Sequence, residues 1–477
     1  MARIAHFRDC LKSDFSKHLR MLADFLSAED ILAATIEAQY QWRDRVWNPV
    51  MTVWTFLIQV LHPGAACREA VAAVLTEQEV ERAVSKPNAQ SACEISPDPS
   101  AYCQARQRVP LAVFKAAFSQ VGHRLQEKVQ DSYLWCGRRV WMADGSSVSM
   151  PDTSELQKAF GQPSGQKPGC GFPVAKIVAL FAWASGAVLD VAVGRLRQSE
   201  LPLLYSIWGL LTPGDILLAD RFFCTYRTLA ELVHRGCDGV FRLSGSRSRT
   251  MDFRKGRRLS RSERLVTWQR PKRRELRISG RQWKRLPKEL TVRLIRFHTQ
   301  VPGYRSQTIT VATTLGDPVA YPMGELVALY GDRWTVELRL RDLKATLKMD
   351  VLRSKTVDVI HKEILMHLLA YNLIRALLWQ ASLAHGRPLH RLSFAGAVQR
   401  LHVMVPYLWL FAGTPRATHL YTMLLEWIAR DMLPCRPGRI EPRAVKRRPK
   451  PYDRLNRPRH ELRAALLRQA GLTVPLP

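Results

Sequence analysis

The chain has 477 residues, of which 47% are hydrophobic and 24% are charged. A chain of this length and hydrophobic content can bury a sizeable core and form roughly two to four structural units, which excludes a disordered protein. Its 72 Lys and Arg residues against 41 Asp and Glu residues give a formal net charge of +31, which favours nucleic acid as a partner over an anionic membrane or a ribosomal context.

Residues 1–130 have a helical pattern. Ser27 is a candidate N-cap ahead of AEDILAATIEAQ, and further helices are expected at 49–61 and 111–126. Basic residues are spread through this region, and they either contact a DNA backbone or simply face solvent. The candidates for a DNA contact are Arg43, Arg45, Arg68, Arg106 and Arg108.

Residues 131–243 change to an alternation of strands and helices. RRVWMADGSSVSM predicts a strand, and AKIVALFAW and AVLDVAVG predict a hairpin joined at Ser185-Gly186. A helix in SELPLLYSIWGLL, the strand DILLAD, a helix in TYRTLAELVHRG and the strand GVFRL follow. This order is an α/β layer plan.

Residues 244–317 interrupt that plan with a basic, β-rich insertion, in which LTVRLIRFHT and TITVATTL are strand-like. Helices resume in residues 318–390, including a long apolar helix at about 357–383. Residues 391–477 are helical and basic. They turn Arg/Pro-rich at RPGRIEPRAVKRRPKPYDRLNRPR, where we expect an extended arm, and end in a short helix, ELRAALLRQ.

The most specific pattern lies in the helical stretch YGDRWTVELRLRDLK. At about 100° per residue, it forms an apolar stripe beside a polar stripe that holds a carboxylate, two cations and a phenol together. Taken alone, it could also be a solvated helix face with a pairing such as Glu337 with Arg341. The apolar stripe comprises Val336, Leu340, Leu343 and Leu347, and the polar stripe comprises Tyr330, Arg333, Glu337 and Lys344.

Two aspartates add to this pattern. Asp144 ends VWMAD and Asp220 ends ILLAD, so each is expected where a buried strand reaches the edge of the sheet. With Glu337 they would form an all-oxygen site suited to two Mg²⁺ ions, or Mn²⁺ in their place. Singly, Asp144 could be a turn residue before Gly145, and Asp220 could pair with Arg221. The combination of three acids with the basic helix favours a catalytic site.

These residues resemble the signature of bacterial DDE transposases of the insertion sequence 4 family, in which Tyr-(2)-Arg-(3)-Glu-(6)-Lys follows two aspartates. The polar stripe meets this spacing without a mismatch, and the aspartates occur as ADG at Asp144 and ADRFF at Asp220. The insertion also stands where the family has one. The resemblance covers most of the chain, more weakly before about residue 137 and after about residue 390.

The resemblance implies an α/β fold with a ribonuclease-H-like mixed sheet and flanking helices, formed by residues 131–243 and 318–390. Residues 1–130 would then bind DNA ends, and residues 391–477 could mediate dimerisation. The implied function is cut-and-paste transposition. Metal ions held by Asp144, Asp220 and Glu337 would cut at the terminal inverted repeats, and the freed 3′-hydroxyl would attack target DNA.

The resemblance also assigns DNA contacts. Tyr330, Arg333 and Lys344 would position the terminal phosphates, because a guanidinium grips phosphate oxygens in bidentate fashion and an ammonium acts as a point charge. Some related enzymes form a DNA hairpin and stack a flipped base on a tryptophan of the insertion. Trp268 and Trp283 are the candidates here, although a tryptophan between strands is also typical of a core.

Double-stranded DNA and a second copy of the chain, as a homodimer on paired ends, are the expected partners. The alternatives are a metal-dependent nuclease acting on structured DNA, a domesticated DNA-binding protein without catalysis, and a basic RNA-binding protein, for which interleaved stacking aromatics are lacking.

The sequence favours a location in the bacterial cytosol. The first residues, MARIAHFRDCLKSDF, lack the apolar run of a secretory signal. The nine cysteines include no CxxC pair, and an odd number favours reduced thiols and no zinc site. The two most apolar stretches, 175–194 and 364–383, carry charged residues, so we expect core elements rather than membrane spans.

Overall fold

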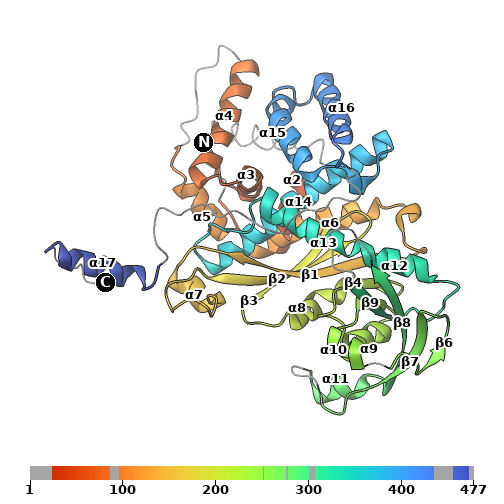
Figure 1. The fold of residues 1–477 in the computed structure, drawn as a ribbon. Coiled ribbons are helices and arrows are strands. Elements are labelled where there is room, and N and C mark those ends of the chain that lie inside the picture. The colour runs from red at the N-terminus through yellow and green to blue at the C-terminus, as the bar shows by residue number, and fades with distance from the viewer. Residues whose placement is uncertain are drawn as a thin grey trace.

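The computed structural model describes residues 24–43, 45–85, 96–250, 252–274, 278–299, 307–434 and 455–471. In this part of the chain one nine-stranded sheet, in the order β3-β2-β1-β4-β5-β9-β8-β7-β6, runs through the molecule (Figure 1). The strands are β1 (Val140–Ser149), β2 (Val174–Ala182), β3 (Val188–Arg195), β4 (Ile216–Ala219), β5 (Asp238–Arg242), β6 (Arg257–Arg258), β7 (Glu263–Gln269), β8 (Glu289–Thr299) and β9 (Gln307–Thr313).

The first five strands form one half of the sheet. β1 pairs antiparallel with β2, and β2 pairs antiparallel with β3, whereas β4 and β5 run parallel to β1. All four residues of β4 are buried, which is typical of a central parallel strand. This order and these directions are those of a ribonuclease-H-like core, so the expected fold class is confirmed.

The insertion is β-rich, as predicted, but its strands do not form a sheet of their own. β9 pairs antiparallel with β5, with Phe241 opposite Ala312, and β8, β7 and β6 continue outward from it. The insertion therefore covers the edge of β5, whose backbone groups would otherwise be unpaired. It also contains the helices α10 (Gly245–Thr250) and α11 (Gly280–Arg285).

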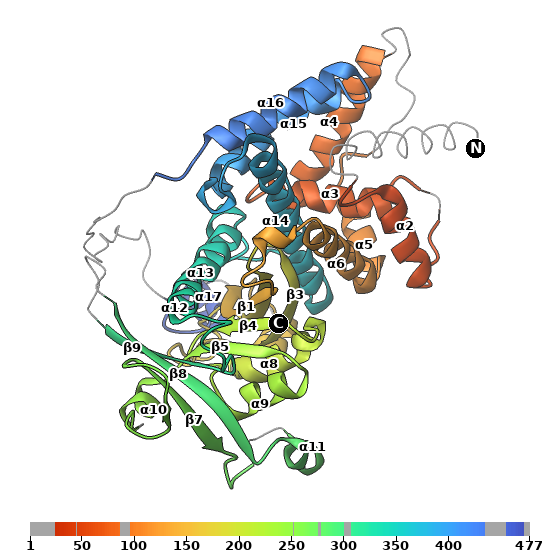
Figure 2. The same ribbon diagram turned by 90° about the vertical axis from the view of Figure 1, so that its right-hand side faces the viewer.

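Helices cover both faces of this five-stranded half (Figure 2). On one face, Thr335 of α13 contacts the sulfur of Met142 in β1. On the other, Gly239 of β5 leaves room for Leu229 and Leu232 of α9. The helices concerned are α7 (Ser154–Phe160), α8 (Glu200–Ile207), η2 (Trp208–Leu210), α9 (Tyr226–His234), α12 (Met323–Asp332), α13 (Trp334–Arg341), η3 (Asp342–Thr346) and α14 (Val357–His385).

The N-terminal helices begin as the sequence predicts. Ser27 and Asp30 form a capping box on α2, and Asn48 caps α3 by accepting from the Met51 amide. The predicted helix 49–61 is matched by α3, and the helix predicted at 111–126 extends one residue further. The helices are α2 (Ala28–Glu37), α3 (Pro49–Leu61), α4 (Cys67–Ser85), α5 (Ser100–Arg108), α6 (Leu111–Glu127) and η1 (Asp131–Tyr133).

The long helix α14 lies between the N-terminal helices and the sheet. Among the described helices it alone is long and apolar enough to cross a membrane, and 94% of its most apolar window is buried inside the protein. Asn372 shows why it belongs to the core, because its side chain hydrogen-bonds both the amide and the carbonyl of Val188 in β3. The prediction of a core helix at this position is confirmed.

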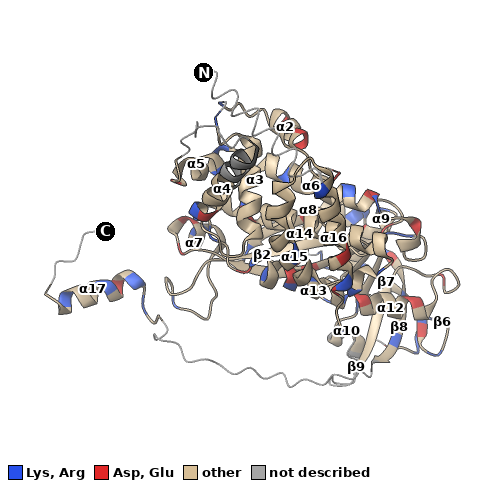
Figure 3. Ribbon diagram, turned by 90° about the horizontal axis from the view of Figure 1, so that it is seen from above, with Lys and Arg blue, Asp and Glu red and all other residues tan. Residues whose placement is uncertain are grey.

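The C-terminal region adds three helices and a 3₁₀ turn. The expected extended arm falls mostly in residues 435–454, which lie outside the described residues. The final helix is present as α17, and it carries three arginines against one glutamate (Figure 3). The elements are η4 (Leu389–Arg391), α15 (Phe394–Leu410), α16 (Pro415–Arg430) and α17 (Arg459–Gln469).

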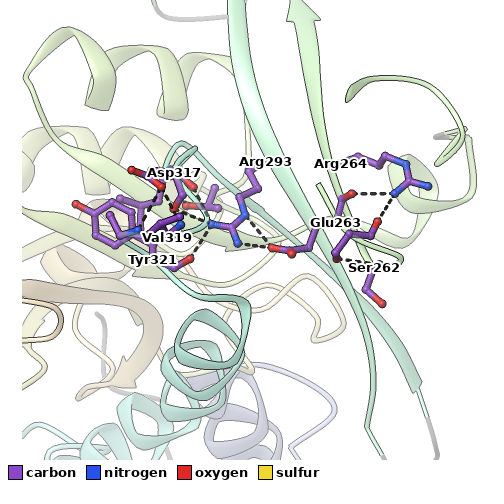
Figure 4. Close-up of polar contacts among 11 residues, drawn as sticks. Ser262, Glu263, Arg264, Arg293, Asp317, Val319 and Tyr321 are labelled. Carbon is purple, nitrogen blue, oxygen red and sulfur yellow. Dashed lines mark hydrogen bonds and ion pairs between the residues drawn. The ribbon is translucent and has the colours of Figure 1, made fainter. Parts of the chain in front are cut away.

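A buried arginine of the insertion contacts the chain that leads into α12 (Figure 4). Arg293 of β8 is 0% exposed and pairs with Glu263 of β7. Its guanidinium also donates to the carbonyl oxygens of Leu315, Asp317 and Tyr321, at 3.5, 3.2 and 2.7 Å. These carbonyl oxygens belong to residues 315–321, the connector that leads into α12. Because α12 starts directly after this connector, the contacts of Arg293 fix where α12 begins.

Candidate active site

A row of charged residues lies where the pairing between the parallel strands β1, β4 and β5 ends. The last residues in register are Ala143, Ala219 and Phe241. Asp144, Asp220 and Arg242 each come one residue later. Residues in register on parallel strands point to the same face of a sheet, and neighbouring strands lie about 4.8 Å apart. Two carboxylates and a guanidinium are therefore placed side by side.

Asp144 is not at the end of its strand, contrary to the sequence prediction. β1 continues to Ser149, paired with β2, and Asp144 lies opposite Ala179. What ends at this point is the pairing with β4, since β4 stops at Ala219. The alternative that Asp144 is a turn residue is therefore wrong, and the strand fixes its backbone on both sides.

The glycine after Asp144 has a packing reason. A Cβ added at Gly145 would lie 2.5 Å from the carboxyl carbon of Glu200, the first residue of α8. Glu200 is also 3.7 Å from the ammonium of Lys176. Successive residues of a strand alternate between faces, so Glu200 lies across the sheet from Asp144. In the Ala-Asp-Gly sequence, the aspartate therefore faces the candidate site and the glycine leaves room for Glu200 on the opposite face.

The prediction that the polar stripe lies on one regular helix is wrong. α12 ends at Asp332, α13 begins at Trp334, and Arg333 stands at the junction. A π-helical turn, η3, follows α13 and contains Lys344. The predicted apolar stripe is confirmed, with all four side chains no more than 6% exposed: Val336, Leu340, Leu343 and Leu347.

Buried polar contacts hold this broken helix on the hairpin between β2 and β3. Arg339 donates to the carbonyl oxygens of Ala182 and Trp183, at 2.8 and 2.9 Å. The indole N–H of Trp183 donates to Asp332 at 3.1 Å. Burial lowers the pKa of the Arg339 guanidinium to about 10. The hairpin thus fixes both α12 and α13 relative to β1.

The three acids share one electrostatic neighbourhood. Burial raises the pKa of Asp144 to about 6, and the negative charges of Glu337 and Asp220 add to this rise. The Gly145 amide, which donates to Asp144 at 2.8 Å, and the cation of Arg333 act in the opposite direction. Glu337 pairs with Arg333 at 2.8 Å, not with Arg341 as the alternative interpretation suggested.

Tyr330 and Lys344 lie on the same side of the sheet as Asp144. Burial raises the pKa of Tyr330 to about 12, with Arg333 and Arg242 opposing the shift and Asp220 adding to it. The ammonium of Lys344 is 3.3 Å from the hydroxyl of Ser146, two residues beyond Asp144 on the same strand. All four residues of the polar stripe thus lie near the row formed by Asp144, Asp220 and Arg242.

The metal site expected from the sequence is not assembled as the side chains stand. Within the described ranges, no group of three or more His, Cys, Asp or Glu side chains could hold a metal ion. Glu337 is turned to Arg333 instead. The donor types still suit hard divalent cations, since all three candidates are carboxylates.

Arg242 is a site residue that the sequence analysis missed. It follows the apolar run of a predicted strand, as Asp144 and Asp220 do, but a lone arginine after a strand is too common to single out. Only the register of β4 with β5 shows that it stands beside Asp220.

The two tryptophans proposed for base stacking have little ring face to offer. Trp283 is 7% exposed and belongs to the core, so its burial contradicts a stacking role in this arrangement. Trp268 is half-buried, and the guanidinium of Arg247 lies 5.7 Å from its ring centroid. Stacking stays a prediction for Trp268 alone.

One of the five N-terminal arginines is part of the fold rather than of a free surface. The guanidinium of Arg106 donates to Gln59 at 3.0 Å and lies 4.5 Å from the ring centroid of Phe56. The prediction of a DNA contact therefore remains for the exposed four. These are Arg43, Arg45, Arg68 and Arg108.

Comparison with known proteins shows a protein family that matches half of this chain. Residues 135–373 match the family model described as the transposase DDE domain. The chain is 28% identical over 370 residues to the transposase InsG for insertion sequence element IS4 of Escherichia coli (strain K12), which covers 74% of this chain and 78% of InsG. It is 32% identical over 143 residues to InsZ of the same organism, covering 29% of this chain and 47% of InsZ.

Among solved structures, the chain resembles the piggyBac transposase in its synaptic complex with hairpin DNA. The TM-score is 0.42 and the sequence identity is 8%, over 87% of this chain and 84% of that chain.

Proposed function

The chain belongs to the DDE transposase family, a class of enzymes that cleave DNA and transfer its strands, and on that premise we propose a specific reaction for it. The transposase binds the terminal inverted repeats of a mobile element and cleaves the DNA by two-metal-ion phosphodiester hydrolysis. It then joins the freed 3′-hydroxyl ends to target DNA. This is cut-and-paste transposition.

Asp144, Asp220 and Glu337 would hold two Mg²⁺ ions, for which Mn²⁺ could substitute. Carboxylate oxygens are the ligands these ions prefer. A bound cation would offset the negative charges of Glu337 and Asp220, which add to the rise that burial causes in the pKa of Asp144. Glu337 would exchange its 2.8 Å contact with Arg333 for the metal. The ions supply activation of the attacking oxygen and stabilisation of the leaving oxygen.

The cations around the acids would hold the DNA backbone. Arg333, once released by Glu337, can donate two hydrogen bonds to a phosphate, and Lys344 supplies a point charge from the opposite end of the polar stripe. Arg242 adds a third cation beside Asp220. Tyr330 stays protonated at neutral pH, because its pKa is raised to about 12, and can therefore donate its hydroxyl to a phosphate oxygen.

Double-stranded DNA is the proposed partner, both as the inverted repeats and as the target. The proposed location of the protein is the bacterial cytosol. The net charge of +31 supports binding to phosphates. A homodimer on paired ends is part of the proposal. Two exposed apolar side chains of α15, Val403 and Tyr407, support a protein contact on that helix.

The observation that carries the proposal is the placement of Asp144 and Asp220 one position beyond the paired residues of two adjacent parallel strands, on the face of the sheet that α13 with Glu337 covers. We expect Asp144→Asn, Asp220→Asn and Glu337→Gln each to lower Mg²⁺-dependent nicking by about 100-fold or more, since metal charge stabilisation is worth several kcal/mol. DNA binding should stay largely intact. The measurement is nicking of a labelled duplex that carries the element's end.

Glu325→Gln is the matched control, because Glu325 is an exposed acid on α12 and should leave nicking unchanged. Nicking at the normal rate by any of the three variants would remove that residue from the site.

Two further observations separate this reaction from the alternatives. A nuclease acting on structured DNA would nick the substrate without joining its 3′ ends to a second duplex, and an inactive DNA-binding protein would do neither. Genomic DNA flanking the coding region should carry inverted repeats bounded by short direct duplications. Their absence would count against a mobile-element enzyme.

A further inference from the structure

The insertion carries a dense group of basic residues on and around α11. In residues 270–274 and 278–288 the sequence has eight lysines and arginines and no acidic residue. Cations gathered in this way repel one another unless an anion offsets their charge. Five of them are exposed and lie on α11 or next to it, and we call these five the basic platform. They are Arg274, Arg281, Lys284, Arg285 and Lys288.

Polar contacts at both ends hold α11 in place. At its start, Ser279 and Gln282 form a capping box. At its end, the guanidinium of Arg270 donates to three backbone carbonyl oxygens. These acceptors belong to Trp283, Lys284 and Leu286, at 3.1, 3.3 and 2.8 Å. The helix therefore presents its outer side chains from a fixed backbone.

The inner side of α11 is buried in the core. Trp283 is 7% exposed and Leu286, which follows the helix, is 4% exposed. The hydroxyl of Tyr226 in α9 donates to the carbonyl oxygen of Pro287 at 2.7 Å, which joins this segment to a helix that packs on the sheet. Trp283 thus anchors the basic platform to the rest of the protein.

The outer side of α11 gathers the cations. Arg281, Lys284 and Arg285 stand at positions i, i+3 and i+4, which share one face of a helix. Arg274 joins them from the preceding segment, since its Nη1 atom lies 3.4 Å from the position that a Cβ at Gly280 would take. Several positive charges are therefore held within reach of one ligand that carries repeated negative charges.

The basic platform is separate from the candidate active site. Ile295 of β8 is level with Arg242, because both lie opposite Val311 of β9. β8 begins six residues before Ile295, at Glu289, which is about 20 Å along a strand. α11 precedes that start, at the end of β7 and β8 that points away from α12 (Figure 1 and Figure 2).

We propose that the basic platform is a second DNA-binding site, which holds the phosphate backbone of a duplex without regard to its sequence. Lysines and arginines that contact phosphates release condensed counterions, and this release drives binding of that kind. The inference rests on the proposed DNA partner but not on the proposed chemistry. Neither the metal ions nor the inverted repeats are needed for it.

The chemistry of the platform favours duplex DNA over other polyanions. Membrane-surface helices insert exposed apolar side chains among the lipids, whereas Trp283 and Leu286 are buried. Sites for single-stranded nucleic acid stack bases on exposed aromatic rings, and Trp283 is the only aromatic residue in 270–288. A contact with the duplex backbone needs only cations in fixed positions.

The test measures how tightly the full-length protein binds a short labelled duplex of arbitrary sequence, without divalent metal, by fluorescence anisotropy at several salt concentrations. The variant Arg281→Ala/Lys284→Ala/Arg285→Ala should bind about 10- to 100-fold more weakly than the wild type at about 100 mM salt. The slope of log affinity against log salt should become shallower by up to about 2.7, since each lost phosphate contact changes it by about 0.9.

A matched variant removes the same charges from scattered places. Lys158→Ala/Arg197→Ala/Arg387→Ala also replaces one lysine and two arginines, all exposed, and should bind nearly as tightly as the wild type. Arg281→Lys/Arg285→Lys keeps the charges of the platform and should keep most of the affinity. An equal loss in the scattered variant would overturn the proposal, because net charge alone would then explain the binding.

A second measurement needs no variant. Acetylation of lysines in the wild-type protein, mapped by mass spectrometry, should slow at Lys284 and Lys288 when the duplex is bound. Vesicles of phosphatidylserine and phosphatidylcholine should give no such protection. The proposal is overturned if both lysines react equally fast with and without the duplex, or if the vesicles protect them and the duplex does not.

The two proposals fail in different ways. A wild-type protein that binds no duplex would remove both the proposed DNA partner and the second site. A wild-type protein that binds the duplex with the same affinity and salt slope as Arg281→Ala/Lys284→Ala/Arg285→Ala would remove the second site alone.

Discussion

Arg242 shows how strand register places a charge that no motif reveals. It stands one position beyond Phe241, just as Asp220 stands one position beyond Ala219 in the neighbouring strand. A cation in that row can meet a phosphate oxygen whose phosphorus lies near the acids. The row therefore combines groups for holding metal ions with a group for holding their substrate.

Replacing Arg242 by alanine should slow DNA cleavage by about 10- to 100-fold, because a hydrogen bond to a charged group is worth about 1.5–3 kcal/mol. Arg242→Lys should recover part of the rate. The measurement is single-turnover cleavage of DNA that is already bound. Arg387→Ala, which removes an exposed arginine beyond α14, is the control, and an equal loss in both variants would remove Arg242 from the site.

Asp342, the first residue of η3, gives a prediction about pH. Burial raises its pKa from 3.8 to about 6, so the folded protein binds this proton more tightly than the unfolded chain does. Asp342 therefore costs stability as the pH rises from about 4 to about 6, by up to about 3 kcal/mol. Asp342→Asn should unfold at a higher temperature than the wild type at pH 8, and at a similar temperature at pH 4. A difference that does not change with pH would contradict the burial of this carboxylate.

At the scale of elements, the sequence predicts the apolar stripe of the catalytic helix but not its break. An ideal period of about 100° per residue is close enough to bring Val336 and Leu340 into the core in either geometry. The junction at Arg333 and the π-helical turn depend on contacts with the β2–β3 hairpin, made through Asp332 and Arg339. Such contacts join residues about 150 positions apart, and no local pattern encodes them.

Arg339 and Arg341 form a matched pair for testing that anchor. Arg339 is half-buried and donates to two carbonyl oxygens, whereas Arg341, two residues later, is exposed. Arg339→Leu should lower the free energy of unfolding by about 2–4 kcal/mol, because it removes two hydrogen bonds from a charged donor and leaves the Trp183 carbonyl without this donor. Arg341→Leu should change it by less than about 0.5 kcal/mol. Urea denaturation measures both, and equal effects would show that Arg339 does not hold the helix.

The candidate site could be predicted in its members more than in its geometry. Asp144, Asp220 and Glu337 follow from their spacing and from the strands and helix on which they lie. The present pairing of Glu337 with Arg333 could not be foreseen, because the sequence also offers Arg341 at helical spacing. From the sequence, Trp283 could be either a base-stacking residue or a core residue, and only its burial decides between the two.

For the whole molecule, the alternation of strands and helices predicts an α/β layer plan, because local periodicity carries that information, whereas the ribonuclease-H-like arrangement was implied by the resemblance to the transposase family. How the insertion joins it could not be predicted, because pairing of β9 with β5 links strands separated by the whole insertion. Sequence patterns give strands but not their partners. The result is one continuous sheet where the sequence suggested an interruption.

The charge of the whole molecule gives the last prediction. With a net charge of +31, DNA affinity should fall steeply with salt, by on the order of 10³–10⁵-fold between about 50 and 200 mM if 6–10 phosphates are contacted. Fluorescence anisotropy with a labelled duplex gives the slope of log affinity against log salt. A slope near zero would mean that phosphates are not what this surface binds.

The clamp that Arg293 forms has a consequence for how such enzymes can diversify. Its guanidinium belongs to the insertion, yet it donates to the carbonyl oxygen of Tyr321 on the connector to α12, so excising the insertion would strip that connector of its buried donor. The segment cannot be exchanged between relatives as a self-contained cassette. Any swap would have to carry Glu263 and Arg293 together, and a change in one of these side chains should be matched by a change in the other, whereas the acceptors on the connector are backbone carbonyl oxygens that any residue supplies.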